Sequence, residues 1–523
     1  MWLHYEVKTL GDIPRHYASV APDTIALVDS AGQSTFAELD QRSNQIANLL
    51  LDMGVGETDH VSILSKNTAV SFELLFGVSK IGATLLPLNW RLAEPELAAI
   101  MADASPVLLI ADMEYERAAN AIVGASEKPC SLLLFDRMVA GSGDFGQRVS
   151  AADSKDPALL VNPLQPVILM YTSGSTGQPK GVMQTHHGHL MTRLCEHLDT
   201  AIVYRPGDVM LTVMPLFHAM GLGLSLQALY NGAAVVAYPM PEPLNLVRLI
   251  EQYKPTILPI VPTVIQMILH LPVAMTADFS SLRTLLYAAS PIEPKLLTKA
   301  LSIFDCDFVQ FYGATETTVE VTFLRAVDHR SGDIKRLKSV GSPLPLVEIK
   351  AVDIHGNEVA PGEVGEFLIR TPTMSAGYRN QAALSFETFK SGWYRSGDAG
   401  YVDEDGFCYL VDRVKDMIIS GGENVYSTEV EHALSQHPAV EMCAVFGLPD
   451  ERWGERVTAA VVIAPGYTAT SIELIDHCRR LIAGYKVPKQ VELVDVLPMT
   501  ASGKIAKPQL RRIFSEEGVT SAD

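Results

Sequence analysis

The sequence predicts an α/β protein made of a large N-terminal domain, a β-rich subdomain and a small α+β C-terminal domain. The chain has 523 residues, which exceeds the size at which one hydrophobic core stops growing, so two or more domains are expected. Helical and strand patterns alternate through the first two-thirds of the chain, which indicates layered α/β subdomains with largely parallel sheets. Near residue 341 the pattern changes to short strands separated by Gly, Pro and Asp turns.

The N-terminal elements can be assigned one by one. Residues 35–38 (Thr-Phe-Ala-Glu) have the form of a capping box, in which a threonine and a glutamate three positions apart bond each other's backbone N–H. The helix that this box opens is expected to end near Gly54. The hydrophobic patterns that follow predict a strand at 60–65, a helix at 70–81, a strand at 84–88, a helix at 94–104 and an extended segment at 106–111.

A compact α+β unit is expected from Asp416 onward. Thr428 and Glu431 have capping-box spacing and predict the start of a helix at this point. Further patterns predict strands at 439–446 and 457–463 and a helix at 471–482.

Composition and charge restrict the class of protein. Hydrophobic residues make up 48% of the chain and charged residues 19%, which is typical of globular enzymes and not of disordered or fibrous chains. Asp and Glu outnumber Lys and Arg by 60 to 41, and the net charge of −19 argues against non-specific binding to nucleic acid. The six cysteines are scattered without CxxC or metal-ligand spacing, which is typical of a reducing compartment. Because neither a signal peptide nor a C-terminal peroxisomal tripeptide is visible, we expect a cytoplasmic protein.

An apolar segment without charged residues lies between Lys254 and Asp278. A membrane-spanning helix needs about 20 smoothly apolar residues, whereas four prolines interrupt this segment. A buried strand to about Ile260, followed by a buried helix from Pro262, fits the pattern better. We therefore expect core and no transmembrane segment.

A loop rich in glycine and hydroxyl residues follows an apolar strand. Residues 171–181 read Tyr-Thr-Ser-Gly-Ser-Thr-Gly-Gln-Pro-Lys-Gly, directly after the apolar run 167–171. Glycines let backbone N–H groups turn inward, hydroxyls add donors and Lys180 adds a positive charge, which together suit a polyphosphate. The loop is not a Walker A motif, because Pro179 and Gly181 stand where that motif has glycine and Ser or Thr. The alternative interpretation is a turn rich in small residues.

This loop closely resembles the signature of the adenylate-forming superfamily, which comprises acyl-CoA synthetases, peptide-synthetase adenylation domains and beetle luciferases. The resemblance extends over five ordered motifs from Tyr171 to Lys504, and the chain looks most like a bacterial-type fatty acid or aryl acid CoA ligase. It implies ATP, Mg²⁺ and CoA as cofactors. It also implies that the ATP phosphates are bound by Thr172, Ser173, Gly174, Ser175, Thr176, Gly177 and Lys180.

Two further motifs resemble nucleotide-binding segments of the family. Within residues 311–317 (Phe-Tyr-Gly-Ala-Thr-Glu-Thr), the resemblance implies that Tyr312 packs on adenine, Thr315 meets phosphate and Glu316 helps to hold Mg²⁺. Such a role for Glu316 is chemically sensible, because Mg²⁺ prefers hard oxygen ligands and usually takes one or two carboxylates. At the end of residues 394–398, Asp398 matches the family residue that accepts hydrogen bonds from the ribose.

Residues 412–416 (Asp-Arg-Val-Lys-Asp) resemble the family's hinge. The resemblance implies that Arg413 contacts the ribose and that Lys415 is the pivot about which a mobile C-terminal domain turns. We therefore place the boundary at Asp412–Lys415. The resulting domains are an N-terminal AMP-binding domain at 1–412 and a mobile catalytic domain at 413–523.

Two C-terminal motifs resemble the parts that serve the two half-reactions. Gly421, Gly422 and Glu423 match a loop that lines the pantetheine channel during acyl transfer to CoA. Lys504 matches the lysine that catalyses adenylation. More than eighty residues separate these motifs within one small domain, so presenting each in turn to one site requires that domain to rotate.

The segment around His218 bears on the substrate. Residues 214–221 (Met-Pro-Leu-Phe-His-Ala-Met-Gly) resemble the synthetase form of the family's substrate motif, whereas relatives that activate amino acids carry aspartate at the position of His218. An α-amino acid is therefore not expected. We predict that His218 contacts the carboxyl group or gates the pocket; the alternative is a packed loop histidine. The acyl pocket is expected to draw on 262–268, 287–290 and 311–314.

The predicted activity is that of an acyl-CoA synthetase, an AMP-forming acid–thiol ligase. A medium- or long-chain fatty acid is favoured as substrate, with an aryl acid of the cinnamate or benzoate type as the alternative. CoA is the expected acceptor, because no carrier domain follows Lys504. A ligase that loads a separate carrier protein, a luciferase-like oxidase and a nucleotide-binding regulator without catalysis are the rival interpretations. The expected partners are small molecules and not nucleic acid, and a homodimer is left open.

Overall fold

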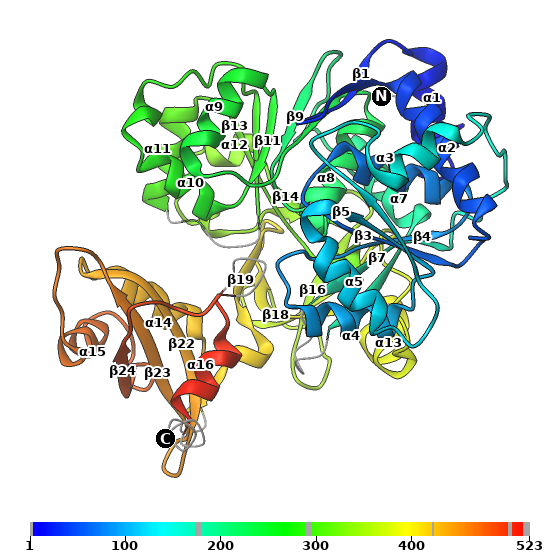
Figure 1. Cartoon of the computed structure of the whole chain (residues 1–523). Coiled ribbons are helices and arrows are strands. Elements are labelled where there is room, and N and C mark those ends of the chain that lie inside the picture. The colour runs from blue at the N-terminus through cyan, green and yellow to red at the C-terminus, as the bar shows by residue number, and fades with distance from the viewer. Residues whose placement is uncertain are drawn as a thin grey trace. The chain divides into compact units, whose positions relative to one another are not determined.

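The structure is a computed structural model that describes residues 4–172, 179–288, 292, 294–420, 423–499 and 505–515. It divides into two compact units (Figure 1). Unit 1 comprises Met1–Ile349 and Ile369–Tyr394, and unit 2 comprises Lys350–Leu368 and Arg395–Asp523. The β-rich segment thus packs with the C-terminal part. The predicted domain boundary at Asp412–Lys415 marks the point about which the C-terminal domain is expected to rotate, and this boundary stays a prediction.

Unit 1 is built on two sheets. The nine-stranded sheet has the order β15-β14-β13-β12-β11-β9-β10-β1-β2, and the six-stranded sheet has the order β6-β5-β3-β4-β7-β8. The nine strands are β1 Ile25–Asp29, β2 Gly32–Thr35, β9 Val209–Thr212, β10 Ala234–Ala237, β11 Ile257–Ile260, β12 Thr284–Tyr287, β13 Asp307–Gly313, β14 Glu320–Leu324 and β15 Ser342–Pro343. The six strands are β3 His60–Leu64, β4 Thr84–Pro87, β5 Leu108–Asp112, β6 Ser131–Phe135, β7 Pro166–Thr172 and β8 Lys180–Thr185.

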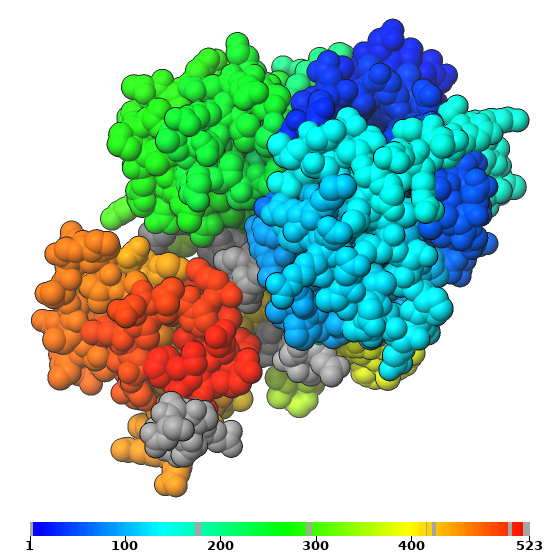
Figure 2. All heavy atoms as spheres, in the orientation of Figure 1, coloured from blue at the N-terminus to red at the C-terminus, as the bar shows by residue number. Residues whose placement is uncertain are grey.

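Helices cover these sheets, as expected for parallel strands that are buried on both faces. They are α1 Asp12–Val20, α2 Phe36–Asp52, α3 Ala69–Lys80, α4 Glu94–Ala104, α5 Glu116–Gly124, α6 Gly143–Ala151, α7 His186–His197, α8 Ala219–Tyr230, α9 Pro243–Tyr253, α10 Pro262–Leu269, α11 Pro294–Phe304, α12 Ala326–His329 and α13 Ala382–Thr388. Helices α9, α10 and α11 form much of the green surface in Figure 2 and pack their apolar faces on β11, β12 and β13.

The sequence patterns predicted these elements well where they were strongly periodic. The capping box at the start of α2 is confirmed, because the Thr35 hydroxyl accepts the Glu38 N–H and the Glu38 carboxylate accepts the Thr35 N–H. The apolar segment after Lys254 is confirmed as a strand followed by a helix, β11 and α10. Among the described residues, no helix is both long and apolar enough to cross a membrane.

Tyr287, at the end of β12, corrects one expectation about the acyl pocket. Its side chain is fully buried in the core formed with α9, α10 and α11, and its hydroxyl bonds His329 Nε2 at 2.8 Å. Because β-strand side chains alternate between the two faces of a sheet, the Tyr287 side chain lies on the face that packs against α9, α10 and α11. The prediction that Tyr287 lines the acyl pocket is therefore wrong for its side chain.

Unit 2 contains a four-stranded sheet of order β16-β17-β18-β19 and a second sheet of order β21-β20-β23-β22, in which β24 pairs with β23. The strands are β16 Glu348–Val352, β17 Gly365–Arg370, β18 Tyr394–Val402, β19 Cys408–Arg413, β20 Ile418–Ser420, β21 Glu423–Val425, β22 Val440–Asp450, β23 Gly454–Ile463 and β24 Gln490–Leu493. The helices are α14 Ser427–Ser435, α15 Ser471–Arg479 and α16 Lys507–Phe514, the last of which is red in Figures 1 and 2.

The predicted cap at Thr428 and Glu431 is wrong, although the helix exists. Helix α14 begins at Ser427, and the side chains with capping-box spacing bond elsewhere. The Thr428 hydroxyl donates to the carbonyl of Val411, and the Glu431 carboxylate accepts the N–H of Val445. Long-range partners thus override the local capping pattern.

Candidate active site

Four loops meet at one edge of the nine-stranded sheet. Strands β9, β11, β12 and β13 are neighbours and run parallel, so their carboxyl ends lie at the same edge. In open α/β sheets this edge is where ligands bind. The segments that follow these strands contain His218, Pro262, Ala288 and Thr315, so the topology brings together the segments that the sequence predicts for substrate and nucleotide.

The loop after β13 has a strained turn. Thr318 has φ +72° and ψ −58°, and Val319 N–H donates to the Thr317 carbonyl at 3.0 Å, which defines a γ-turn of the rare type. Such strain persists only where the surroundings enforce it, and it is common at functional sites. Here the Thr318 hydroxyl donates to the Thr373 carbonyl, and the Thr373 hydroxyl donates to the Thr317 carbonyl at 2.9 Å.

A buried glutamine fixes the same loop to the other sheet. Gln184, on β8, donates from Nε2 to the carbonyls of Thr315 and Thr318, each at 3.0 Å. Its Oε1 accepts Nε2–H of His189 at 3.2 Å, which assigns the tautomer of that ring. Burial lowers the pKa of His189 to about 3, so this imidazole is neutral and donates without adding charge. The six-stranded sheet therefore anchors the predicted phosphate-contacting loop.

Three polar side chains lie together beside this loop: the predicted residues Lys180 and Glu316, and Tyr378, which was not predicted. Tyr378 donates its hydroxyl to Oε1 of Glu316 at 2.8 Å, and the Lys180 ammonium lies 5.4 Å from the centre of the Tyr378 ring. Burial and the Glu316 charge raise the pKa of Tyr378, so its phenol remains a proton donor. The structure thus brings Glu316 to the hydroxyl and Lys180 to the ring of one tyrosine, although the two residues are more than a hundred positions apart in the chain.

Sequence reasoning missed Tyr378. It stands alone between Gly377 and Arg379 without a periodic pattern or a charged neighbour cluster, so its own surroundings in the chain carry no functional signal. The main-chain contacts of β8 place it there, because Met183 N–H donates to the Gly377 carbonyl at 3.0 Å.

The loop before α8 is held by Asn67, which sequence reasoning also missed. The Asn67 side chain is buried, donates to the Met214 carbonyl at 2.9 Å and accepts the Leu216 N–H at 3.1 Å. Phe217 then packs its ring 4.7 Å from that of His218, which precedes the first turn of α8.

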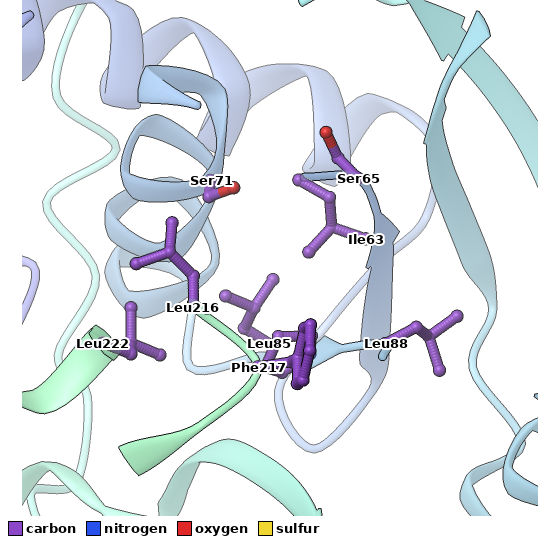
Figure 3. Close-up of a pocket in the computed structure, with 9 residues that line it drawn as sticks. Ile63, Ser65, Ser71, Leu85, Leu88, Leu216, Phe217 and Leu222 are labelled. Atoms are coloured by element: carbon purple, nitrogen blue, oxygen red, sulfur yellow. The ribbon is translucent and has the colours of Figure 1, made fainter. Parts of the chain in front are cut away.

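Phe217 lines a small, mostly apolar pocket (Figure 3). The other apolar side chains labelled around this pocket are Ile63, Leu85, Leu88, Leu216 and Leu222. The pocket has a volume of about 10 Å³, which is room for a single water molecule and not for an acyl chain. The side chains packed around the pocket therefore hold the loop that carries His218. The pocket itself is too small for a substrate.

In unit 2, strand pairing joins the two residues predicted to hold the ribose. Asp398 on β18 is directly opposite Arg413 on β19 in the antiparallel register. Arg413 Nε lies 2.7 Å from Asp398 Oδ1, and Asp398 is largely buried whereas half of the Arg413 side chain is exposed. The register confirms their proximity, while their contact with ribose stays a prediction.

The remaining predicted residues divide into two groups. Tyr312 is described and buried on β13, and Thr172 is paired with Lys180 across β7 and β8. Outside the described residues, or with side chains that are not described, lie Ser173, Gly174, Ser175, Thr176, Gly177, Lys415, Gly421, Gly422, Glu423 and Lys504.

A buried charge cluster lies behind the strained loop. Arg193 on α7 bonds Glu196 at 2.7 Å and lies 4.0 Å from Glu320, which opens β14. All three side chains are at most 4% exposed. Among the described residues, three of the four carboxylate oxygens accept no hydrogen bond from a donor group. Burial, reinforced by the Glu320 charge, raises the pKa of Glu196 well above its ordinary 4.5 despite Arg193. A proton held between the two carboxyl groups would satisfy two of these three oxygens.

Comparison with known proteins gives a consistent result over the full length. Residues 14–379 match the family model described as AMP-binding enzyme, and residues 429–504 match the AMP-binding enzyme C-terminal domain. A fatty acid–[acyl-carrier-protein] ligase, ScoC from Streptomyces coeruleorubidus, is 36% identical over 98% of this chain and 97% of its own. A feruloyl-CoA synthase from Amycolatopsis is 39% identical over 97% of this chain and 99% of its own. The solved structure of the anthranilate CoA ligase AuaEII with anthranoyl-AMP superposes with a TM-score of 0.88 at 29% identity, covering 99% of both chains.

Proposed function

This chain belongs to the adenylate-forming superfamily as an AMP-forming acid–thiol ligase, and on that premise we propose that it activates an apolar carboxylic acid and transfers the acyl group to CoA. The observation that carries the proposal is the cluster of Lys180, Tyr378 and Glu316 beside the Thr315–Thr318 loop. It places a cation and an oriented carboxylate where parallel strands end, at the usual ligand-binding edge.

The reaction explains why such groups are needed. A carboxylate that attacks the α-phosphate of ATP is an anion approaching an anion, so positive charge must offset the repulsion. Lys180 supplies charge toward the leaving pyrophosphate, and Lys504 is proposed to stabilise the charge that develops on the α-phosphate. Asp398 and Arg413 are proposed to fix the ribose.

Glu316 suits a magnesium ion. Tyr378 engages one of its two carboxylate oxygens, and the second accepts no hydrogen bond from the described residues. An oriented carboxylate with a free oxygen is the donor that Mg²⁺ prefers. When bound there, the ion would neutralise charge on the ATP phosphates.

The relatives support two classes of acid and two acceptors. A medium- or long-chain fatty acid is our first substrate hypothesis, consistent with the fatty acid that the ScoC name gives. An aryl acid is the second, favoured by the 39% identity to a feruloyl-CoA synthase. CoA is proposed as acceptor, with a carrier protein as the alternative because ScoC is named for that acceptor. A cytoplasmic location and a homodimer stay predictions.

A panel assay tests the function. Pyrophosphate and AMP release are measured with saturated fatty acids of increasing length and with hydroxycinnamates and benzoates, each without acceptor, with CoA and with a holo carrier protein. We expect pyrophosphate release that depends on the acid and turnover that depends on CoA. Turnover with the carrier protein alone would replace CoA as acceptor, and absence of acid-dependent pyrophosphate release across the panel would contradict the proposal.

Tyr378→Phe is expected to lower the rate of adenylation about ten- to a hundredfold, because one hydrogen bond to a charged group contributes about 1.5–3 kcal/mol and about 1.4 kcal/mol corresponds to a factor of ten. The ring that lies against Lys180 is retained, so the loss reports on the orientation of Glu316. The Mg²⁺ concentration for half-maximal pyrophosphate release should rise in parallel. Tyr253→Phe is the matched control, because it removes a hydroxyl on α9 that bonds the hydroxyl of Tyr238, and it should leave both quantities unchanged. A Tyr378→Phe enzyme with an unaltered Mg²⁺ dependence would contradict this role.

A further inference from the structure

Helix α14 is capped by a residue far from it in the chain. The N-cap position is Tyr426, whose side chain offers no acceptor to the first turn of the helix. The Asp412 carboxylate takes that role, because its Oδ2 accepts the N–H of Ser427 at 2.5 Å and the Ser427 hydroxyl at 2.8 Å. A negative charge at a helix N-terminus is favourable. Asp412 is 9% exposed and Ser427 fully buried, so water competes little for these bonds.

Helix α16 contributes a further residue to this contact. Lys507, on its first turn, donates to the Ser427 hydroxyl at 2.5 Å and lies 2.8 Å from Glu431. Lys507 follows Lys504 by three residues, so the contact also fixes the chain next to the predicted adenylation lysine.

These bonds cross the predicted pivot. Asp412 lies before Lys415 in the chain, whereas Ser427 and Lys507 lie after it. The Thr428 hydroxyl crosses in the same way to the Val411 carbonyl. A rotation about residue 415 changes the position of the residues after it relative to those before it. Such a rotation must therefore break or rebuild these hydrogen bonds.

We propose that Asp412, Ser427 and Lys507 form a latch that holds the segment after Lys415 in one of its two working positions. Asp412 is thereby a positioning residue that sets the ratio of adenylation to thioester formation. The inference rests on the proposed function. Charge-assisted hydrogen bonds are the strong ones, so loss of the Asp412 charge is expected to shift this ratio by about tenfold.

Asp412→Asn and Ser427→Ala test the latch in the full chain. One single-turnover measurement follows pyrophosphate release from acid and ATP without CoA. The other follows thioester formation from supplied acyl-adenylate and CoA. We expect both variants to change the ratio of the two rates in the same direction. The use of two variants guards against one that fails to fold.

Glu429→Gln is the matched control. Glu429 pairs with Lys486 at 2.7 Å, and both residues lie after the pivot, so this variant loses an ion pair that rotation does not touch. Its ratio should equal that of the parent. If Asp412→Asn and Ser427→Ala also leave the ratio within twofold of the parent, the latch is overturned.

Limited trypsin digestion separates failure of the latch from failure of the proposed function. Trypsin cleaves after Arg413 and Lys415, and half of the Arg413 side chain is exposed. Should the parent protein form no adenylate from any acid, the proposed function fails and cleavage alone decides about the latch. Cleavage at these sites that is several-fold faster in Asp412→Asn than in Glu429→Gln supports the latch, and equal cleavage overturns it.

Discussion

Replacing Lys504 with alanine is expected to reduce acyl-adenylate formation at least a hundredfold while sparing thioester formation from supplied acyl-adenylate. The first half-reaction brings two anions together, and removal of one group that stabilises the developing charge costs about 10²–10³ in rate. The second half-reaction starts from a mixed anhydride that is already activated, and it is proposed to use the segment around Gly421–Glu423 instead.

The two half-reactions are measured separately, as pyrophosphate release without CoA and as thioester formation from synthetic acyl-adenylate. Lys486→Ala is the matched control, because it removes a lysine of unit 2 that pairs with Glu429. Equal loss of both half-reactions in the Lys504 variant would refute the assigned role, since it would indicate general damage to unit 2.

Replacing Arg193 with methionine is expected to destabilise unit 1 by about 3–5 kcal/mol, because it leaves a buried acidic pair without its counter-charge. The three side chains are almost fully buried, so solvent cannot compensate. Thermal and urea unfolding should show the loss directly. The triple variant Arg193→Met, Glu196→Gln, Glu320→Gln removes all three ionisable groups and should recover most of the lost stability. A single Arg193→Met variant that loses less than about 1 kcal/mol would contradict the interpretation.

The same cluster predicts a dependence on pH. Because burial raises the pKa of Glu196 in the folded state, the folded protein binds more protons than the unfolded chain above pH 4.5. Stability from this group is therefore complete below pH 4.5 and is lost as pH rises toward the raised value. Glu196→Gln removes this titration. The melting temperature of the variant minus that of the parent should therefore increase as the pH rises from 5 to 8.5. The other titratable groups around the cluster keep one protonation state across this range. The pKa of His189 is about 3 and that of Asp208 is lowered, whereas the pKa values of Cys195, Tyr204 and Tyr230 are raised by burial.

The sequence predicted the parts of the molecule that depend on local pattern. Helix α2 follows from its capping box, and β11 and α10 follow from an apolar run with a proline at the break. It could not predict bonds between distant segments, which is why Thr428 was misassigned as a cap and the capping by Asp412 went unseen.

The same limit applies to the candidate site. Glu316 and Lys180 were found because their motifs resemble those of a known family, whereas Tyr378 and Asn67 carry no such signal in the residues around them. Their roles arise from strand pairing and from a buried side-chain amide, which appear only in the folded structure. The alternation of buried faces along β12 likewise decided where Tyr287 points.

The way Gln184 holds the loop after β13 has a consequence for how such enzymes diversify. The loop that is predicted to contact the nucleotide phosphates is anchored from the six-stranded sheet, whereas the loops after β9, β11 and β12 follow neighbouring strands of the other sheet. Mutations that reshape those three loops therefore leave the Gln184 hydrogen bonds to the loop after β13 in place. An enzyme of this fold can therefore change its specificity for the acid through mutations in one set of loops, while the loop after β13 keeps its support from the other sheet.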